Sequence, residues 1–185
     1  MQARTSRRTA ITALGAGAAG IASLSLLPRA AVAAISSSAG IVAGGSLEGP
    51  NGPIQFSAFG SRTQLDDAED LVFQGALAWH DAAGLDGAAV TISLVSVKSY
   101  GPHDTETSRL MTGTAAVNGE GEHPFSLRMV DGGEVGAGGD SVRLVVGTGA
   151  AELSGTPEAV EADGSFDYDV EGELVSGNIQ TVTLA

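Results

Sequence analysis

The sequence contains no cysteine, and this absence excludes several kinds of chemistry at once. Disulfides, thiolate metal sites and cysteine nucleophiles cannot occur in this chain. An exported protein that lacks disulfides must be held together by packing, by its backbone hydrogen bonds or by bound ions.

Basic residues are scarce, with nine Lys and Arg against 22 Asp and Glu, and Lys98 is the single lysine. The formal net charge is −13, and all of the acidic residues follow position 33. A surface this acidic repels phosphate backbones and anionic lipids, so nucleic acid is not an expected partner. Such acidity is also typical of proteins that stay hydrated in concentrated salt, which is an alternative reason for it.

Long apolar runs are rare too, and the clearest one, residues 10–27, lies near the N-terminus behind Arg7 and Arg8. Paired arginines ahead of a weakly hydrophobic segment resemble a twin-arginine translocation signal, although an alanine stands at position 10 where phenylalanine is usual. Ala31 and Ala33 form the small-x-small pattern of a signal-peptidase site. The segment therefore predicts export and cleavage after Ala33; an uncleaved anchor is the alternative.

The expected organisation follows from this signal. We assign residues 1–33 to the signal peptide, 34–40 to a short spacer and 41–185 to a single domain. No second long apolar run follows, so no membrane span is expected after signal removal. The predicted location is the medium or the cell surface.

An alternating pattern dominates the segment from Val117 to Gly147. Apolar residues recur at every second position in Phe125, Leu127 and Met129, and again in Val142, Leu144 and Val146. This is the period of a strand that buries one face. Asn118-Gly119 is a strong hairpin signal, and Asp131-Gly132-Gly133 opens a glycine-rich loop, so the segment predicts a hairpin with a long connection.

Aromatic residues make up only 4% of the chain, and this scarcity bears on the choice between a β-sandwich and a β-barrel. Similar alternation elsewhere gives about nine short strands separated by turn signals, including one at Gly177-Asn178. We expect an all-β fold, an antiparallel β-sandwich of immunoglobulin-like or jelly-roll-like type, because the strands are short and few aromatic residues are available to fill a barrel. Trp79 is expected in the core and Tyr100 at an exposed strand end.

Four segments carry a resemblance to a known class of protein. They are GGSLEGPNGPIQFSAF, VNGEGEHPFSLRMVDGG, GGDSVRLVV and FDYDVEGELVSGNIQ. Together they resemble small secreted prokaryotic β-sandwich domains that accompany choice-of-anchor modules. The resemblance lies in turns and strands, and it implies a non-catalytic extracellular module without assigning a functional residue.

Catalytic motifs are missing from the sequence. His80, His103 and His123 have no zinc-motif spacing, no G-x-S-x-G elbow occurs, and no phosphate-binding glycine loop opens a helix. We therefore expect no enzyme. Because the chain has so many carboxylates, a secreted hydrolase that uses loop carboxylates stays open as the alternative.

Acidic loop residues form the best candidate site, and the ion that suits them is calcium. The candidate ligands fall in two groups, one between expected strands and one around the glycine-rich loop: Asp66, Asp67, Glu69 and Asp70, and then Asp131, Glu134 and Asp140. Neither group matches an EF-hand, and ordinary solvated loops are the alternative. No other cofactor is expected.

The sequence thus predicts an exported, non-catalytic structural or binding module whose ligand is unknown. A cell-wall component, a glycan or a protein could be its partner. Glycan binding would use exposed aromatic side chains, for which Trp79, Tyr100 and Tyr168 are the candidates.

Overall fold

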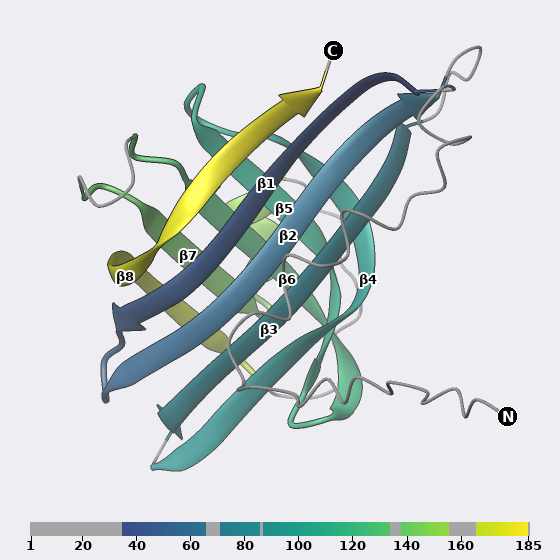
Figure 1. The fold of residues 1–185 in the computed structure, drawn as a ribbon. Helices are drawn as coiled ribbons and strands as arrows, with labels where there is room; N and C mark the ends of the chain where they lie inside the picture. Colours follow the sequence, from purple (N-terminus) through teal and green to yellow (C-terminus); the bar gives the residue numbers. More distant parts are fainter. Residues whose placement is uncertain (1–34, 66–70, 86, 134–137, 156–165, 185) are drawn as a thin grey trace, which may run out of the picture.

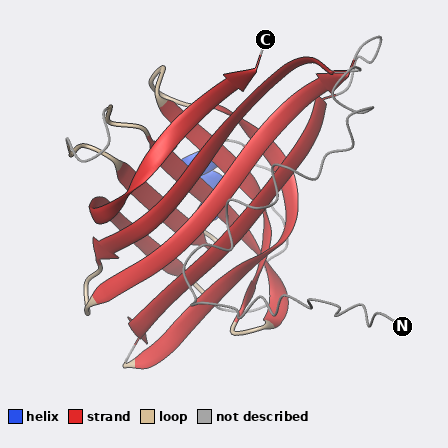
Figure 2. Ribbon diagram, in the orientation of Figure 1, coloured by secondary structure: helices blue, strands red, loops and turns tan. Residues whose placement is uncertain are grey.

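The computed structural model describes residues 35–65, 71–85, 87–133, 138–155 and 166–184, and these form one antiparallel β structure (Figures 1 and 2). Its elements, in chain order, are β1 (Ile35–Glu48), β2 (Pro53–Leu65), β3 (Leu71–Leu85), β4 (Ala88–Pro102), β5 (Ser108–Val117), β6 (Glu120–Val130), β7 (Ser141–Val146), α2 (Ala150–Ser154) and β8 (Tyr168–Leu184).

The eight strands close into a barrel, so the predicted β-sandwich is wrong. Each strand pairs with its neighbour in the sequence, and β8 pairs with β7 through its first part and with β1 through its second part. In Figure 1, β8, β1, β2 and β3 run diagonally across the near wall, with other strands behind them. Eight strands enclose a space that side chains can just fill.

The last strand explains why the sequence predicted one strand too many. Gly177 has a φ of 107°, yet β8 continues through it to Leu184 instead of turning back. A side chain at Gly177 would overlap the carbonyl oxygen of Gly44 on β1. This glycine therefore permits a close approach of two paired backbones, at a point next to a register shift between Ser46 and Leu47.

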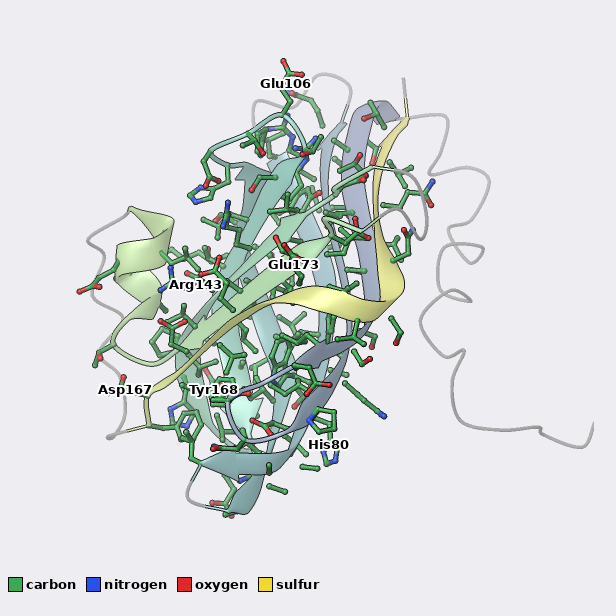
Figure 3. All side chains as sticks on the ribbon, turned by 90° about the vertical axis from the view of Figure 1, so that its left-hand side faces the viewer. His80, Glu106, Arg143, Asp167, Tyr168 and Glu173 are labelled. Atoms are coloured by element: carbon green, nitrogen blue, oxygen red, sulfur yellow. The ribbon has the colours of Figure 1, made fainter. Side chains whose placement is uncertain are left out.

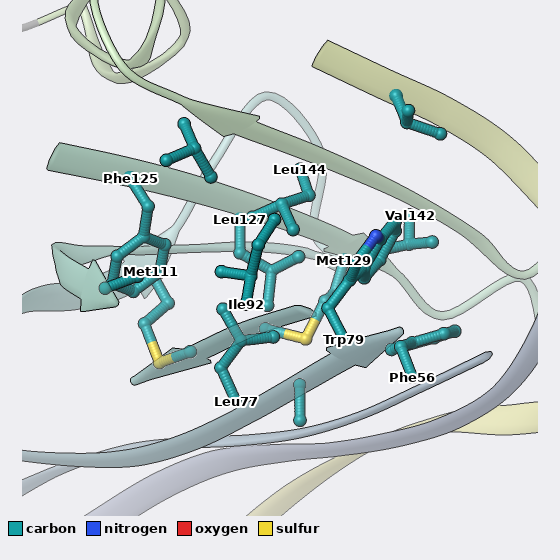
Figure 4. Packing of buried hydrophobic residues seen from close by; sticks show 14 of the residues in the cluster. Phe56, Leu77, Trp79, Ile92, Met111, Phe125, Leu127, Met129, Val142 and Leu144 are labelled. Carbon is teal, nitrogen blue, oxygen red and sulfur yellow. The ribbon is translucent and has the colours of Figure 1, made fainter. Parts of the chain in front are cut away.

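The barrel interior is filled by apolar side chains, most of them aliphatic, that alternate with outward-facing residues along each strand. Figure 4 shows several of them, from Phe125 and Met111 at one side to Val142 and Phe56 at the other. Glycines narrow the space that remains: a Cβ at Gly60 would lie 2.7 Å from the Tyr100 ring. Because the glycines reduce the volume that side chains must fill, the barrel needs few aromatic residues, and the scarcity of aromatics did not favour a sandwich.

The predicted hairpin from Val117 to Gly147 is confirmed as β6 and β7, preceded by the turn from β5. Asn118 and Gly119 have φ angles of 52° and 82°, as a type I′ turn requires. The Asn118 side chain also accepts a hydrogen bond of 2.8 Å from the backbone N–H of Thr91 on β4. The turn thereby fastens three strands together at this end of the barrel.

Strand β4 is irregular at two places. Register shifts occur between Leu94 and Ser96 and between Val97 and Ser99 in its pairing with β5. Each shift is a bulge that brings the next apolar residue back to the inner face. As a result Tyr100 points into the barrel and is only 3% exposed, so its predicted exposure at a strand end is wrong, whereas the predicted burial of Trp79 is confirmed.

The short helix α2 was not expected from the sequence. It packs outside the barrel against β6 and β7, where the Ser126 hydroxyl donates a hydrogen bond of 2.6 Å to the carbonyl of Ala150. It ends at Gly155, whose φ of 64° gives the left-handed conformation common at helix C-termini. The helix covers Val145, which faces outward yet is buried.

Candidate functional site

A groove of about 670 Å³ lies on the outer wall of the barrel across β1, β2, β3 and β4. The residues at its centre have small side chains, and larger side chains at these positions would fill the groove. Polar groups that can donate and accept hydrogen bonds surround this centre. The outward-facing lining consists of Ser46, Gln55, Ser57, Ala78, His80, Thr91, Ser93 and Ser176.

The lining of the groove contains no Asp, Glu, Lys or Arg. This is unusual for a chain with a formal net charge of −13. The charged side chains of β6, β7 and the first part of β8 instead pair with one another elsewhere on the outer wall. Arg143 on β7 binds Asp169 on β8 at 2.8 Å, and Arg128 on β6 binds Glu171 on β8 at 3.5 Å. The groove is thus an uncharged area on an acidic molecule.

The three histidines are not brought together. His80 is exposed at the groove, whereas His103 lies beside Asp104 in the β4–β5 loop, with 3.4 Å between Nε2 and Oδ1. His123 on β6 packs against the Phe166 ring, with centroids 5.7 Å apart. Among the residues that the structure describes, no three His, Asp or Glu side chains are grouped so that they could hold a metal ion.

A buried polar chain joins Trp79, Tyr168 and Asp81 at the lower end of the barrel. The Trp79 indole donates to the Tyr168 hydroxyl at 2.8 Å, and that hydroxyl donates to Asp81 at 3.0 Å. The other Asp81 oxygen accepts from the backbone N–H groups of Ala83 and Gly84 at 3.1 and 2.7 Å. Asp81 is only 2% exposed. Every strong donor and acceptor in this cluster has a partner, so we infer that the cluster of Trp79, Tyr168 and Asp81 has a structural role.

The environment of Tyr168 supports this interpretation. Burial raises the pKa of its hydroxyl well above the usual range, and the neighbouring Asp81 carboxylate raises it further, against the lowering effect of the Trp79 hydrogen bond. The hydroxyl therefore stays protonated and acts as a donor. The cluster could not be predicted from the sequence, because Asp81 and Tyr168 are 87 residues apart in the chain.

Two of the predicted calcium ligands have a different role in the structure. Asp131 and Asp140 lie near the two ends of the β6–β7 connection, and their carboxylates accept backbone hydrogen bonds from the second part of β8. Asp131 accepts from the N–H of Thr181 at 2.8 Å, and Asp140 from the N–H of Ile179 at 2.6 Å. Because β7 begins only at Ser141, these two side chains bind β8 beyond the end of its ladder with β7.

Replacing Asp131 or Asp140 with asparagine should lower the free energy of unfolding by about 1–3 kcal/mol each. Both oxygens of each carboxylate accept hydrogen bonds, the second ones coming from Gly133 and Gly132, and an amide offers only one acceptor. Urea denaturation would measure the change. Glu173→Gln is the control, because it also removes one charge but from an exposed side chain; equal stability of all three variants and the wild type would contradict the role of the loop.

The remaining predicted ligands, Asp66, Asp67, Glu69, Asp70 and Glu134, lie outside the described residues. So do the export signal with Arg7 and Arg8 and the cleavage site at Ala31 and Ala33. Calcium binding and export therefore stay predictions. In the described part of the chain, no helix has the length and apolar character needed to cross a membrane.

Comparison with known proteins adds no assignment: no family model matches the chain, and neither a curated protein nor a solved structure matches it. Function has to be inferred from the barrel and its surfaces.

Proposed function

We propose that the chain is an exported, non-catalytic binding module that uses the outer groove to hold a neutral, polyhydroxylated ligand such as an extracellular polysaccharide. The observation that carries the proposal is the uncharged lining of the groove. Hydroxyl, amide and imidazole groups can exchange hydrogen bonds with sugar hydroxyls, whereas the acidic remainder of the surface repels anionic polymers.

A binding role accounts for the groove better than hydrolysis does. Glycoside hydrolysis uses a pair of carboxylic acids that flank the bond to be cleaved. The groove lining has none, and His80 is its single titratable side chain. The aromatic residues that sequence analysis named for glycan stacking are buried: Trp79, Tyr100 and Tyr168 all face the barrel interior. Recognition would therefore depend on hydrogen bonds and shape rather than on stacking.

Filling the groove provides the test. Ser57 and Ala78 are paired across β2 and β3 at its centre, so Ala78→Trp should occupy the space while a β-strand tolerates the larger side chain. On an array of neutral polysaccharides we expect wild-type binding and a loss of at least about tenfold in Ala78→Trp, equivalent to about 1.4 kcal/mol. His80→Ala should weaken binding by a smaller factor.

Ala76→Trp is the matched control. Ala76 is exposed and faces outward on the same strand, but it does not line the groove. This variant should bind as the wild type does. Wild-type protein that binds no neutral polysaccharide, or variants at 76 and 78 that behave alike, would contradict the proposed function.

A further inference from the structure

The upper end of the barrel interior, opposite the Asp81 end, contains a second set of polar groups that the outer groove does not use. Arg62 on β2 and Arg109 on β5 continue the inward-facing series of their strands, and Tyr100 on β4 points inward beside them. Arg109 donates hydrogen bonds to the backbone carbonyl oxygens of Glu106 and Ser108 at 2.7 and 2.8 Å, which fixes its place next to the β4–β5 loop. Figure 3 shows Glu106 at the opposite end of the molecule from His80 and Tyr168.

The Tyr100 hydroxyl is buried and no acceptor takes its hydrogen, because the polar groups beside it are the guanidinium groups of Arg109, which donates to it, and of Arg62. Its ring packs over Gly60, which fixes the side chain inside the barrel with only 3% of its surface exposed. A buried hydroxyl whose hydrogen has no acceptor costs about 1–3 kcal/mol, so proteins rarely leave one. Such a group at the end of a barrel indicates that something else completes its hydrogen bonding.

Both arginines differ from the two that lie on the outer wall. Arg128 and Arg143 each pair with carboxylates there. Neither Arg62 nor Arg109 has a carboxylate within ion-pair distance among the residues that the structure describes. In a chain that has 22 acidic residues, two half-buried guanidinium groups near one phenol form a local concentration of hydrogen-bond donors and positive charge.

The state of the phenol fits this set of donors. Burial raises the pKa of Tyr100 to about 12, although the charge and the hydrogen bond of Arg109 and the charge of Arg62 act in the opposite direction. The hydroxyl is therefore protonated at neutral pH and able to donate. Two guanidinium groups and one hydroxyl offer several donors, and the charges that accompany them are positive, so the group that complements them is an anion with oxygen acceptors.

We propose that Arg62, Tyr100 and Arg109 form a binding site for a small oxyanion, a carboxylate or a phosphate, at the upper end of the barrel. The planar guanidinium groups would each give two parallel hydrogen bonds to the oxygens, and the Tyr100 hydroxyl would donate a further one from below. This site is separate from the outer groove, so its test is independent of the proposed polysaccharide binding.

The probes are inorganic phosphate and acetate, added to the full ¹⁵N-labelled chain at constant ionic strength while the arginine Nε–Hε signals are recorded. We expect saturable shifts of the Arg62 and Arg109 signals and constant signals from Arg128 and Arg143, which serve as internal controls. A larger effect of acetate would identify a carboxylate site, and a larger effect of phosphate a phosphate site. Equal shifts of all four signals, or none, would overturn the proposal.

Variants separate binding from folding. Tyr100→Phe keeps the ring on Gly60 and removes only the oxygen, so without anion it should melt at or above the wild-type temperature. Its affinity for the better anion should fall about 2- to 10-fold, and that of Arg62→Gln more than tenfold. Arg143→Gln should bind like the wild type. A Tyr100→Phe variant that melts clearly lower, or binds equally well, would show that the hydroxyl has no ligand to complete it.

Discussion

Gly113→Ala should lower the free energy of unfolding by roughly 3 kcal/mol, one of the two largest effects that we expect from a single substitution. Gly113 lies on β5 opposite Val97 on β4, next to the first bulge. The bulge brings the carbonyl oxygen of Ser96 over the Gly113 Cα, where a methyl group would overlap it. The obstacle is backbone, so a change of side-chain rotamer cannot relieve it.

Gly101→Ala is the matched control for this effect, because it adds the same methyl group in the paired strand. The nearest atom to that methyl group is the Arg62 Nη1, at 4.0 Å. The variant should change stability by less than about 0.5 kcal/mol, as substitutions in open positions do. Chemical denaturation of both variants measures the difference. Equal stability of Gly113→Ala and Gly101→Ala would mean that the Ser96 carbonyl does not lie over Gly113, and it would contradict the bulge between Leu94 and Ser96.

Asp81→Asn is the second large effect, with an expected loss of about 3 kcal/mol in the free energy of unfolding. The carboxylate accepts from Tyr168 on one oxygen and from the backbone N–H groups of Ala83 and Gly84 on the other. An amide keeps one acceptor and turns an N–H group toward a donor, so at least one buried donor loses its partner.

Tyr168→Phe tests the same cluster from its other side. It removes the acceptor of the Trp79 indole and one donor to Asp81, and it should cost less, about 1–2 kcal/mol. The double variant should lose less than the sum of the two single effects, because both remove the same hydrogen bond. Glu106→Gln, in an exposed loop, controls for loss of charge. Stability unchanged in Asp81→Asn would contradict the structural role of the buried carboxylate.

Much of the strand structure could be predicted from alternation alone. The pattern through Phe125, Leu127 and Met129 places β6 correctly, and Asn118-Gly119 identifies its turn, because both signals act within a few residues. Closure could not be predicted this way. Whether β1 pairs with β8 depends on contacts between the two ends of the chain, and period-two burial is the same in a sandwich and a barrel.

Glycine gave the most misleading signal. Gly177 resembles a turn residue in the sequence, but it marks the place where β8 passes close to β1. Gly60 and Gly113 also allow other groups to come close to the strand backbone: the Tyr100 ring packs on Gly60, and the carbonyl oxygen of Ser96 lies over Gly113. A glycine in a strand pattern has either meaning, and only its spatial neighbours distinguish them.

The functional candidates were harder to predict because they are assembled across strands. Ser57, Ala78 and Ser93 form the groove only when β2, β3 and β4 are in register, and no pair of them is close in sequence. Arg62 and Arg109 likewise meet near Tyr100 through the barrel interior. By contrast, the sequence of their loop predicts Asp131 and Asp140 as calcium ligands, and in the described residues both accept hydrogen bonds from backbone N–H groups of the loop and of β8.

A disulfide between β1 and β8 tests barrel closure most directly. Val42 and Gln180 are Cα partners in this ladder, and partners in antiparallel strands lie about 4.5–5.5 Å apart, within the range that a disulfide spans. The chain has no cysteine of its own, so only the introduced pair can react. The barrel predicts that Val42→Cys/Gln180→Cys forms an intramolecular disulfide on oxidation, while Val42→Cys/Thr112→Cys, which joins β1 to β5, does not. Free thiols in the first variant, or a disulfide in the second, would contradict the closed barrel.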